Sequence, residues 1–413
     1  MISEKVLARL YGEEKAPSQR LRYEKAEKGF ISHFGSDGDI RIFSAPGRTE
    51  IGGNHTDHNH GCVLAAAVDL DAIAFVRKTD NGIITVISDG FEISPVDISD
   101  TAKKKEEENT SEGLIRGMAA GLSSAGCDIC GFDAYVTSDV IPGSGLSSSA
   151  AFEVLIGRII SGLCGSDISA VEIAKISQYS ENEYFGKPSG LMDQTASSVG
   201  GFITIDFADT ASPVIDSIDC DLSAHGFELF IVDTKGSHKD LTPDYASIPA
   251  EMKSVAAFFG KTVLREITKE QLLDNISAVR EKCGDRAVLR ALHFFDENER
   301  AVCEAEHLRK NDIAAFLDDV KASGNSSYKY LQNICSPADP SSQGVALGLY
   351  TAESVLCGKG ACRVHGGGFA GTIQAFVPRE LTEKFISAEE KVFGAGCCHR
   401  LRIRPVGGTE VTG

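Results

Sequence analysis

The stretch 142–151, PGSGLSSSAA, constrains the fold of this chain more than any other segment. Before it, residues 132–137 place apolar or aromatic side chains at alternating positions, which predicts a strand. After it, Phe152, Leu155 and Ile159 recur at helical spacing. The stretch is therefore predicted to be a glycine- and serine-rich loop that leaves a strand and begins a helix.

A loop in this position suits a bound anion. Free backbone N–H groups and the positive end of the helix dipole meet at a helix N-terminus, and glycine lets the backbone approach a phosphate closely. One serine would suffice for an ordinary N-cap, whereas Ser147, Ser148 and Ser149 follow Gly-x-Gly here and add hydroxyl groups that suit a phosphate or Mg²⁺. The loop is not a Walker loop, which needs Lys after the last Gly, nor a dinucleotide fingerprint, because Ser148 replaces the third Gly.

The charge of the chain limits its partners. With 41 basic and 59 acidic side chains the formal net charge is −18, so nucleic acid and anionic membranes are poor partners and a substrate anion must be bound by local groups. No apolar run reaches the roughly 18 residues of a membrane span, and the first residues lack the apolar core of a signal peptide. We therefore expect a cytoplasmic protein whose twelve cysteines are free thiols.

The length of 413 residues is enough for two domains. Strand patterns dominate the first half and helical patterns the second, so we predict an α+β protein with a strand-rich domain at 1–210 and a helix-rich domain at 211–413. The predicted strands are 39–43, 63–68, 72–76, 132–137, 202–207, 227–232, 372–377 and 401–405. The predicted helices are a short one within 1–38, followed by a loose connection, and 114–122, 151–160, 171–184, 249–263, 289–308, 313–320, 343–357 and 381–393.

A second segment, residues 48–61, is rich in polar side chains yet lies between apolar strand patterns. Burying so many polar groups is costly unless each finds a partner, which favours a ligand site. The alternative is a metal site made of His55, Asp57, His58 and His60. Their spacing is that of a loop and not the i, i+4 spacing of a helical metal site, which makes the metal site the weaker hypothesis.

Two further short segments are candidates for a site. Residues 190–194, GLMDQ, place a single carboxylate, Asp193, on a turn before a helical pattern. Residues 364–371, VHGGGFAG, predict a second glycine-rich loop ahead of an apolar strand pattern. Both segments therefore present polar or backbone groups beside regular elements, where binding residues are commonly found.

Taken together, these segments resemble the motifs of the GHMP small-molecule kinases, in the same order and at similar spacing. Residues 47–57 are close to the signature that marks galactokinases within that family, residues 145–150 look like its ATP loop, and residues 190–194 are similar to its catalytic-base segment. The resemblance implies a two-domain fold with the active site between the domains. It also implies ATP-dependent phosphorylation of the anomeric hydroxyl of a hexose, with galactose as the expected sugar.

The resemblance implies roles for individual residues. Asp193 would be the general base that takes the proton of the sugar hydroxyl, and Arg48 beside it would stabilise the transferring phosphoryl group and keep the carboxylate ionised. Ser149 and Glu181 match the positions linked to Mg²⁺, which prefers hard oxygen ligands. The residues expected to contact ATP are Gly143, Ser144, Gly145, Leu146, Ser147, Ser148 and Ser149. The residues expected to contact the sugar are Asn54, His55, Thr56, Asp57 and Tyr245.

The chain departs from the family pattern at several positions. Asn54 stands where the family has an acidic residue that contacts a sugar hydroxyl, and His58 replaces a tyrosine. Lys187-Pro188 replaces a small stretch that contains cysteine, residues 246–249 replace an arginine-rich run, and Ala370 replaces a glycine. None of these changes removes a catalytic group, but the first leaves open a related 1-kinase that acts on a uronic acid or an amino sugar.

Two other classes of protein are alternatives. A galactokinase-like sugar sensor would bind ATP and sugar without turnover, but such proteins lose residues of the ATP loop, and residues 147–150 are complete here. An esterase is suggested by the HGGG run at 365–368, but the chain has no G-x-S-x-G elbow. The expected partners are thus a small sugar and ATP, and the sequence does not indicate an oligomeric state.

Overall fold

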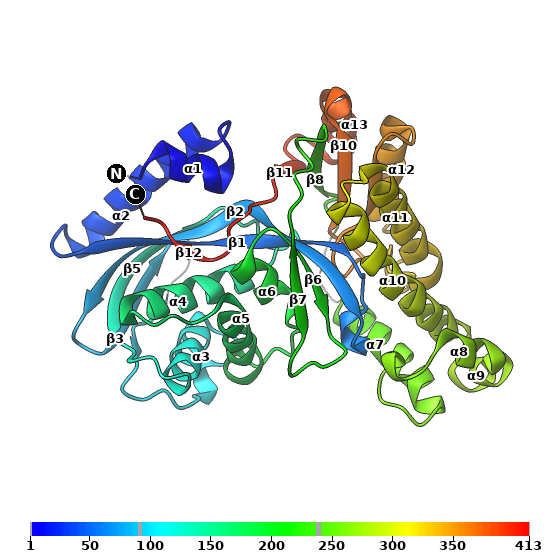
Figure 1. The fold of residues 1–413 in the computed structure, drawn as a ribbon, viewed down its shortest axis with the longest axis horizontal. Coiled ribbons are helices and arrows are strands. Elements are labelled where there is room, and N and C mark those ends of the chain that lie inside the picture. The colour runs from blue at the N-terminus through cyan, green and yellow to red at the C-terminus, as the bar shows by residue number, and fades with distance from the viewer. Residues whose placement is uncertain (1, 90–92, 237–240, 413) are drawn as a thin grey trace.

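The computed structural model describes residues 2–89, 93–236 and 241–412, and two β-sheets organise it (Figure 1). The larger sheet has the order β12-β1-β2-β5-β3-β4, with β6 paired to β2 and β7 to β6, and all its pairs are antiparallel except β3 with β5. Its strands are β1 (Ile40–Gly52), β2 (Cys62–Thr79), β3 (Ile83–Ser88), β4 (Val96–Asp97), β5 (Gly131–Ser138), β6 (Phe202–Asp206), β7 (Val214–Ile218) and β12 (Thr409–Glu410). The smaller, antiparallel sheet has the order β11-β8-β10-β9 and consists of β8 (Phe227–Asp233), β9 (Ala361–Val364), β10 (Thr372–Pro378) and β11 (Cys398–Leu401).

The helices fall into two groups along the chain. Those packed on the larger sheet are α1 (Glu4–Tyr11), α2 (Ala16–Phe34), α3 (Ser111–Ser124), α4 (Ser148–Cys164), α5 (Ala170–Tyr179), a π-helical turn (Ser180–Phe185) and α6 (Met192–Val199). The later helices are α7 (Thr242–Phe258), α8 (Lys269–Asp274), α9 (Ile276–Cys283), α10 (Asp285–Arg309), α11 (Ile313–Ser326), a second π-helical turn (Ser327–Leu331), α12 (Gly344–Leu356) and α13 (Thr382–Phe393). Within the described ranges, no helix combines the length and the apolar character needed to cross a lipid bilayer.

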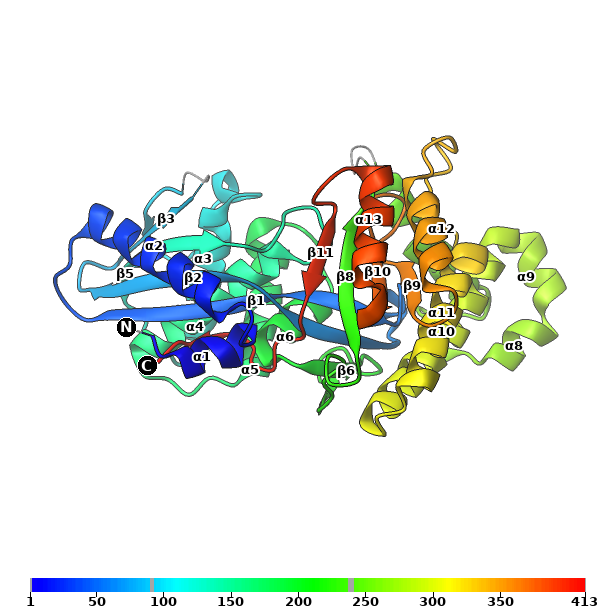
Figure 2. The ribbon, with the colours of Figure 1, turned by 90° about the horizontal axis from the view of Figure 1, so that it is seen from above.

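Both faces of the larger sheet are covered, which explains the nearly continuous apolar run of β2. Along this strand Ala74 and Val76 pack against the core beneath α3 and α4, whereas Ile73 and Phe75 face α1 and α2. Successive side chains of a strand point to opposite faces, so a strand between two helical layers becomes apolar throughout. Figure 1 and Figure 2 show α1 and α2 across one face of this sheet and α3 to α6 on the other.

The smaller sheet is also enclosed by helices. Phe230 and Ile373 belong to the apolar cluster that α12 and α13 cover. On the opposite face, Leu229 and Phe376 pack against α11, where the rings of Phe316 and Phe376 meet edge to face with centroids 5.3 Å apart. The helices α7 to α12 gather on the side of the molecule away from α1 and α2 (Figure 1).

One apolar cluster joins the two sheets, because it contains Leu64 and Phe202 of the larger sheet and Phe376 of the smaller one. The chain also crosses back near its end, where β12 pairs with β1. The predicted division into 1–210 and 211–413 cuts the chain between β6 and β7, and it stays a prediction.

The first strand is longer than its sequence pattern predicts. β1 extends beyond residues 39–43 and stays paired with β2, with register shifts between Pro46 and Arg48 and between Glu50 and Gly52. Such bulges interrupt the two-residue period of the side chains and redirect the strand locally. Arg48 therefore lies on a bulged strand and not on the loop that the sequence indicated.

Other differences concern the extent of elements. The N-terminal part holds more helix than the predicted short one, since α2 runs for 19 residues and buries Tyr23, Ala26 and Phe30, which are spaced three and four apart. The strand patterns at 63–68 and 72–76 merge into the single strand β2. Both differences arise because packing against the sheet extends elements whose isolated patterns are short.

Candidate active site

The sequence segments singled out above come together where β1, the start of α4, the start of α6 and the loop after β9 meet. The Arg48 backbone N–H donates to the Leu146 carbonyl over 3.0 Å. The Thr372 hydroxyl donates to the Ser144 carbonyl over 3.1 Å. The glycine- and serine-rich loop at 142–151, the serine loop, is thus bonded to β1 on one side and to β10 on the other. Asp193 lies beside it on α6.

Asp193 forms the centre of this arrangement. Arg48 donates from Nε to Oδ1 and from Nη2 to Oδ2 of Asp193, each over 2.7 Å. The Ser147 hydroxyl donates to Oδ2 over 2.7 Å, and Arg48 also contacts the Gly145 carbonyl. The Asp193 side chain keeps 29% of its surface exposed, so the carboxylate is fixed in place and still accessible to a ligand.

The electrostatics keep this carboxylate ionised. Burial opposes the charge of Asp193, but the Arg48 guanidinium and the hydrogen bonds from Arg48 and Ser147 outweigh it, so its pKa lies below the ordinary value. Burial likewise opposes the charge of Arg48, but the negative charge of Asp193 and its hydrogen bonds outweigh the effect of burial, so the Arg48 pKa is raised. Asp193 lies in the first turn of α6, where the helix dipole also favours a negative charge.

The serine loop has an unusual backbone. Gly143, Gly145 and Ser147 have φ of 74°, 75° and 58°, in the left-handed region that favours glycine. Gly145 is also needed for space, because a Cβ there would come within 2.9 Å of Nδ1 of His365. The Ser147 side chain forms no capping bond to α4, since its hydroxyl bonds Asp193, and the first N–H groups of α4 are therefore available to an anion.

The side chains of the loop differ in exposure. Leu146 is fully buried, and the Ser144 hydroxyl is buried and donates to the Ile141 carbonyl over 2.7 Å. Gly143 is exposed, and Ser148 and Ser149 are half-buried. Contact with ATP is therefore compatible with the exposed Gly143 and with the half-buried residues 145 and 147–149. The predicted contacts of the buried Ser144 and Leu146 stay predictions.

The two residues predicted to bind Mg²⁺ lie together. Ser149 Oγ, at the start of α4, is 3.5 Å from Glu181 Oε1, on the first π-helical turn. Both are hard oxygen ligands, and Mg²⁺ in kinases is commonly held by one or two protein oxygens plus phosphates. In the part of the chain that the structure describes, no group of three or more His, Cys, Asp or Glu side chains could hold a metal, so the four side chains at 55–60 do not form the alternative metal site.

Sequence reasoning missed the residues around Glu181. Gln194 donates from Nε2 to Oε2 of Glu181 over 2.8 Å and to Oε2 of Glu153 over 3.2 Å. Glu153 is fully buried, and its burial together with the charge of Glu181 raises its pKa well above the ordinary value. Lys187 pairs with Glu181 over 2.9 Å. A usable signal existed for Glu153, which is a lone acid on the apolar face of α4.

His55 and Asp57 lie at the end of the polar segment. His55 has φ of 60° and its Nε2 is 3.0 Å from the Gly367 carbonyl, so Nε2 carries the proton. Burial and the neighbouring His58 lower the His55 pKa to about 4, and the ring is neutral near pH 7. Asp57 lies against the base segment, since a Cβ on Gly190 would come within 2.8 Å of its Oδ2.

Asn54 is fully buried, and its amide is held by protein groups. Its Nδ2 donates to Glu50 and to the Gly366 carbonyl, each over 2.8 Å. Its Oδ1 accepts from Ser327 over 3.2 Å and from Asn333 over 2.9 Å. The predicted contact of Asn54 with a sugar hydroxyl stays a prediction, and it would require at least one of these four bonds to open.

Thr56 and Tyr245 also bond the protein itself. Thr56 is fully buried, and its hydroxyl lies within 2.8 Å of the Gly53 carbonyl and 2.7 Å of the Cys62 carbonyl. Tyr245, on α7, donates from its hydroxyl to the Gly368 carbonyl over 3.1 Å. Thr56 therefore shapes the turn, whereas Tyr245 brings α7 against the last glycine loop.

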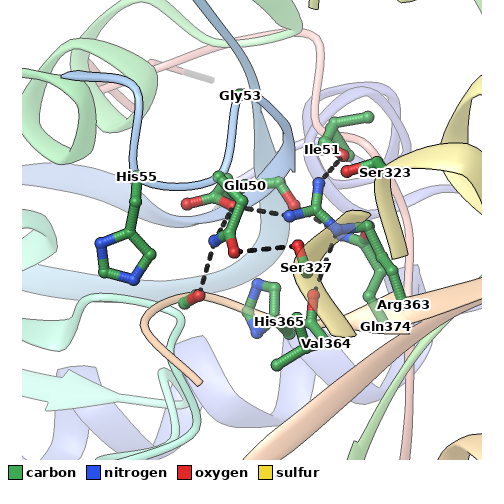
Figure 3. Close-up of polar contacts among 12 residues, drawn as sticks. Glu50, Ile51, Gly53, His55, Ser323, Ser327, Arg363, Val364, His365 and Gln374 are labelled. Carbon is green, nitrogen blue, oxygen red and sulfur yellow. Dashed lines mark hydrogen bonds and ion pairs between the residues drawn. The ribbon is translucent and has the colours of Figure 1, made fainter. Parts of the chain in front are cut away.

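A buried ionic network supports the polar segment from behind (Figure 3). Arg363 of β9 pairs with Glu50 over 3.0 Å and donates to the Ile51 carbonyl. Glu297 of α10 accepts from the backbone N–H groups of Gly53 and Asn54 over 3.2 and 3.3 Å. No local sequence pattern predicts these pairs, because the partners lie hundreds of residues apart.

The arrangement as a whole has the parts of a group-transfer site. It combines an ionised carboxylate, a guanidinium fixed beside it, a loop of free N–H groups and a pair of oxygen ligands. Phosphoryl transfer needs such positioned charges more than it needs covalent chemistry from the protein.

Comparison with known proteins agrees with this chemistry. Residues 113–201 match the GHMP kinases N terminal domain, and residues 28–78 match the galactokinase galactose-binding signature. A galactokinase of Streptomyces coelicolor is 31% identical over 358 residues, which cover 86% of this chain and 89% of that protein. A galactokinase of Glaesserella parasuis is 31% identical over 366 residues, which cover 87% and 91%.

Solved structures show the same fold. The Lactococcus lactis galactokinase complexed with galactose aligns with a TM-score of 0.79 at 23% identity, over 94% of this chain and 100% of that chain. The mevalonate kinase of Methanococcus jannaschii aligns with a TM-score of 0.64 at 15% identity, over 89% and 99%. The predicted α+β, two-domain architecture is thereby confirmed.

Proposed function

The chain belongs to the galactokinase family within the GHMP kinases, and from this premise we propose how its residues transfer the γ-phosphoryl group of ATP to the anomeric hydroxyl of galactose. The prediction of an ATP-dependent sugar 1-kinase is confirmed by the relatives, which favour galactose over the other sugars considered. The observation that carries the residue assignment is the accessible Asp193 carboxylate, held by two hydrogen bonds from Arg48 and one from Ser147.

Asp193 would orient the anomeric hydroxyl and take its proton as the bond to phosphorus forms. Its lowered pKa keeps it in the accepting form, and general-base catalysis requires an acceptor within hydrogen-bonding reach of the proton. Arg48 would fix the carboxylate and place a positive charge beside the phosphoryl group as negative charge spreads over its oxygens. The half-exposed position of Asp193 leaves room for the sugar.

The serine loop would bind the phosphates of ATP. It has left-handed residues at 143, 145 and 147, and α4 begins directly after them. Backbone N–H groups in such a turn form a concave site for an anion, and the helix dipole adds to the attraction. The negative net charge of the chain makes this local site necessary.

Ser149 and Glu181 would hold Mg²⁺ together with the phosphates. Their facing oxygens, 3.5 Å apart, fit a hard cation. When bound, the metal neutralises phosphate charge that the protein cannot fully neutralise itself. Gln194 fixes the orientation of Glu181 by holding its other oxygen.

The sugar would lie between the polar segment and Asp193. His55 donates its Nε2 proton to Gly367 and so offers Nδ1 as an acceptor, and Asp57 offers a carboxylate close to the base segment. These two residues are partly exposed, unlike Asn54 and Thr56. We therefore assign direct sugar contacts to His55 and Asp57 and keep Asn54, Thr56 and Tyr245 as supports of the loops around them.

A product assay with the purified chain tests this proposal. ATP and Mg²⁺ are incubated with galactose, galacturonate, N-acetylgalactosamine or glucose, and the phosphorylated carbon is identified by phosphorus NMR. We expect galactose 1-phosphate as the main product. Binding of ATP and galactose without any phosphorylated sugar would instead indicate a sugar sensor. A strong preference for galacturonate would indicate that the chain is a uronic-acid 1-kinase.

A further inference from the structure

Lys187 is a cation at the edge of the proposed phosphate site. Its Nζ is 2.9 Å from Oε1 of Glu181, and the same oxygen lies 3.5 Å from the Ser149 hydroxyl. The Lys187 side chain is 58% exposed, whereas that of Glu181 is 4% exposed. The ammonium therefore lies on the solvent side of a buried carboxylate, next to the start of α4.

The surroundings leave Lys187 as the main counter-charge of Glu181. Oε2 of Glu181 accepts from Gln194, whose amide carries no charge. Glu153, which bonds the same amide, adds no positive charge. Among the described residues, Lys187 is the only basic side chain in an ion pair with Glu181. Its charge also lowers the pKa of Asp193, so the ammonium is near enough to act on both acids.

This pairing must change if Glu181 binds a metal. A divalent cation and an ammonium would compete for one carboxylate oxygen, and their like charges repel each other. The exposed ammonium can be solvated by water as it leaves, and a bound cation would give the buried Glu181 carboxylate a new counter-charge. The flexible, mostly exposed stem of lysine allows the ammonium to move to a nearby acceptor.

We propose that Lys187 is a phosphate-binding residue: it pairs with Glu181 in the nucleotide-free protein and moves to a terminal phosphate oxygen of ATP when the nucleotide binds with its metal. This inference rests on the proposed function, because it uses the serine loop as the phosphate site. It assigns a second cation to the phosphates, in addition to Arg48. It also gives a role to a position where the chain departs from the pattern of the family.

The test compares nucleotide affinities by isothermal titration calorimetry in the presence of Mg²⁺. Lys187→Met removes the charge and keeps the length of the stem, and Lys187→Arg keeps the charge. Lys321→Met is the matched control, because Lys321 pairs with Asp318 on the surface of α11 at 3.0 Å. ATP and ADP probe the terminal phosphates, and AMP probes the rest of the nucleotide.

We expect Lys187→Met to weaken ATP binding by about 10-fold, as for the loss of a charge-assisted hydrogen bond. AMP binding should stay as in the wild type, Lys187→Arg should stay within about threefold for ATP, and Lys321→Met should change nothing. The melting temperatures of Lys187→Arg and Lys321→Met should match that of the wild type. Lys187→Met leaves the buried Glu181 without its ammonium, so its affinities are measured below its own melting transition.

Wild-type affinity of Lys187→Met for ATP would overturn the inference and leave Lys187 as the counter-ion of Glu181 alone. An equal loss for ATP and AMP would also overturn it, because it would indicate a general disturbance of the site. In both cases the wild-type protein still binds ATP and phosphorylates galactose, so the proposed function stands. If the wild-type protein does neither, the proposed function and this inference fall together.

Discussion

Asp193 and Asp71 are both paired with arginine, yet they lie in very different surroundings. Asp71, on β2, is fully buried, and Arg22 and Arg404 contact it over 2.6 and 2.7 Å. Tyr11 and Ser44 also donate to it, so its acceptor positions are filled by the protein. The pKa is lowered in both cases, because in each the arginine charge and hydrogen bonds outweigh the cost of burial.

The difference lies in what remains accessible. The Asp193 side chain keeps 29% of its surface exposed and that of Asp71 keeps none. A lowered pKa therefore does not by itself mark a catalytic acid, because a structural ion pair produces the same direction of shift. Exposure beside a loop of free N–H groups distinguishes Asp193, and this distinction can be tested by parallel substitutions.

The largest expected effect is on turnover. Asp193→Asn should lower kcat for galactose by about 10²- to 10⁴-fold, because the amide is nearly isosteric but cannot accept the proton. Affinity for ATP and the free energy of unfolding should change little. The measurement is a coupled ADP-release assay beside calorimetric ATP binding, with Asp318→Asn as the exposed control. Turnover within a few-fold of wild type would remove Asp193 from the role of base.

The parallel substitution is Asp71→Asn, which should lower the free energy of unfolding and leave kcat unchanged. It leaves Arg22 and Arg404 without their carboxylate, and breaking a buried ion pair costs about 3–5 kcal/mol. Urea denaturation should show this loss, while the folded fraction keeps its kcat. If Asp71→Asn lowered kcat as strongly as Asp193→Asn, the contrast between the two carboxylates would be wrong.

A smaller effect is expected from Arg48→Lys. The substitution keeps a positive charge but loses the two parallel hydrogen bonds to Asp193, so kcat should fall by about 10- to 100-fold. Arg363→Lys provides a comparison, because Arg363 pairs with Glu50 in the buried network and does not touch Asp193. The main consequence of Arg363→Lys should be a lower melting temperature. If Arg363→Lys lost more kcat than Arg48→Lys, the assignment of Arg48 to the catalytic site would be contradicted.

The smallest effect is expected from pH. A carboxylate with a lowered folded pKa contributes stability that is present above its unfolded pKa and is lost as the pH falls through the folded value. Asp193 should therefore stay ionised well below pH 5, and kcat/KM should show no acid limb due to it between about pH 5 and about pH 8. An acid limb that is centred above about pH 5 and absent from Asp193→Asn would show that Arg48 does not hold the carboxylate ionised.

Local patterns predicted much of the fold correctly. The strand at 132–137, the loop after it and the helix that follows correspond to β5, the serine loop and α4. Alternation and helical spacing show which face of an element is buried, so they predict the element whatever packs against that face. The pattern failed at β1, where bulges at Arg48 and Gly52 break the alternation although the backbone pairing continues.

The site divides in the same way. The sequence by itself determined that a glycine- and serine-rich turn precedes a helix and that a single carboxylate lies where a turn leads into α6, because glycine conformations and turn chemistry are local properties. The place of Arg48 beside Asp193, 145 residues away, was implied by the resemblance and by no local pattern. Only the tertiary structure decided that the Asn54 amide is held by protein groups and that Lys187 pairs with Glu181. The direction, burial and pKa of a polar side chain depend on the neighbours that folding brings to it, and those neighbours come from distant parts of the chain.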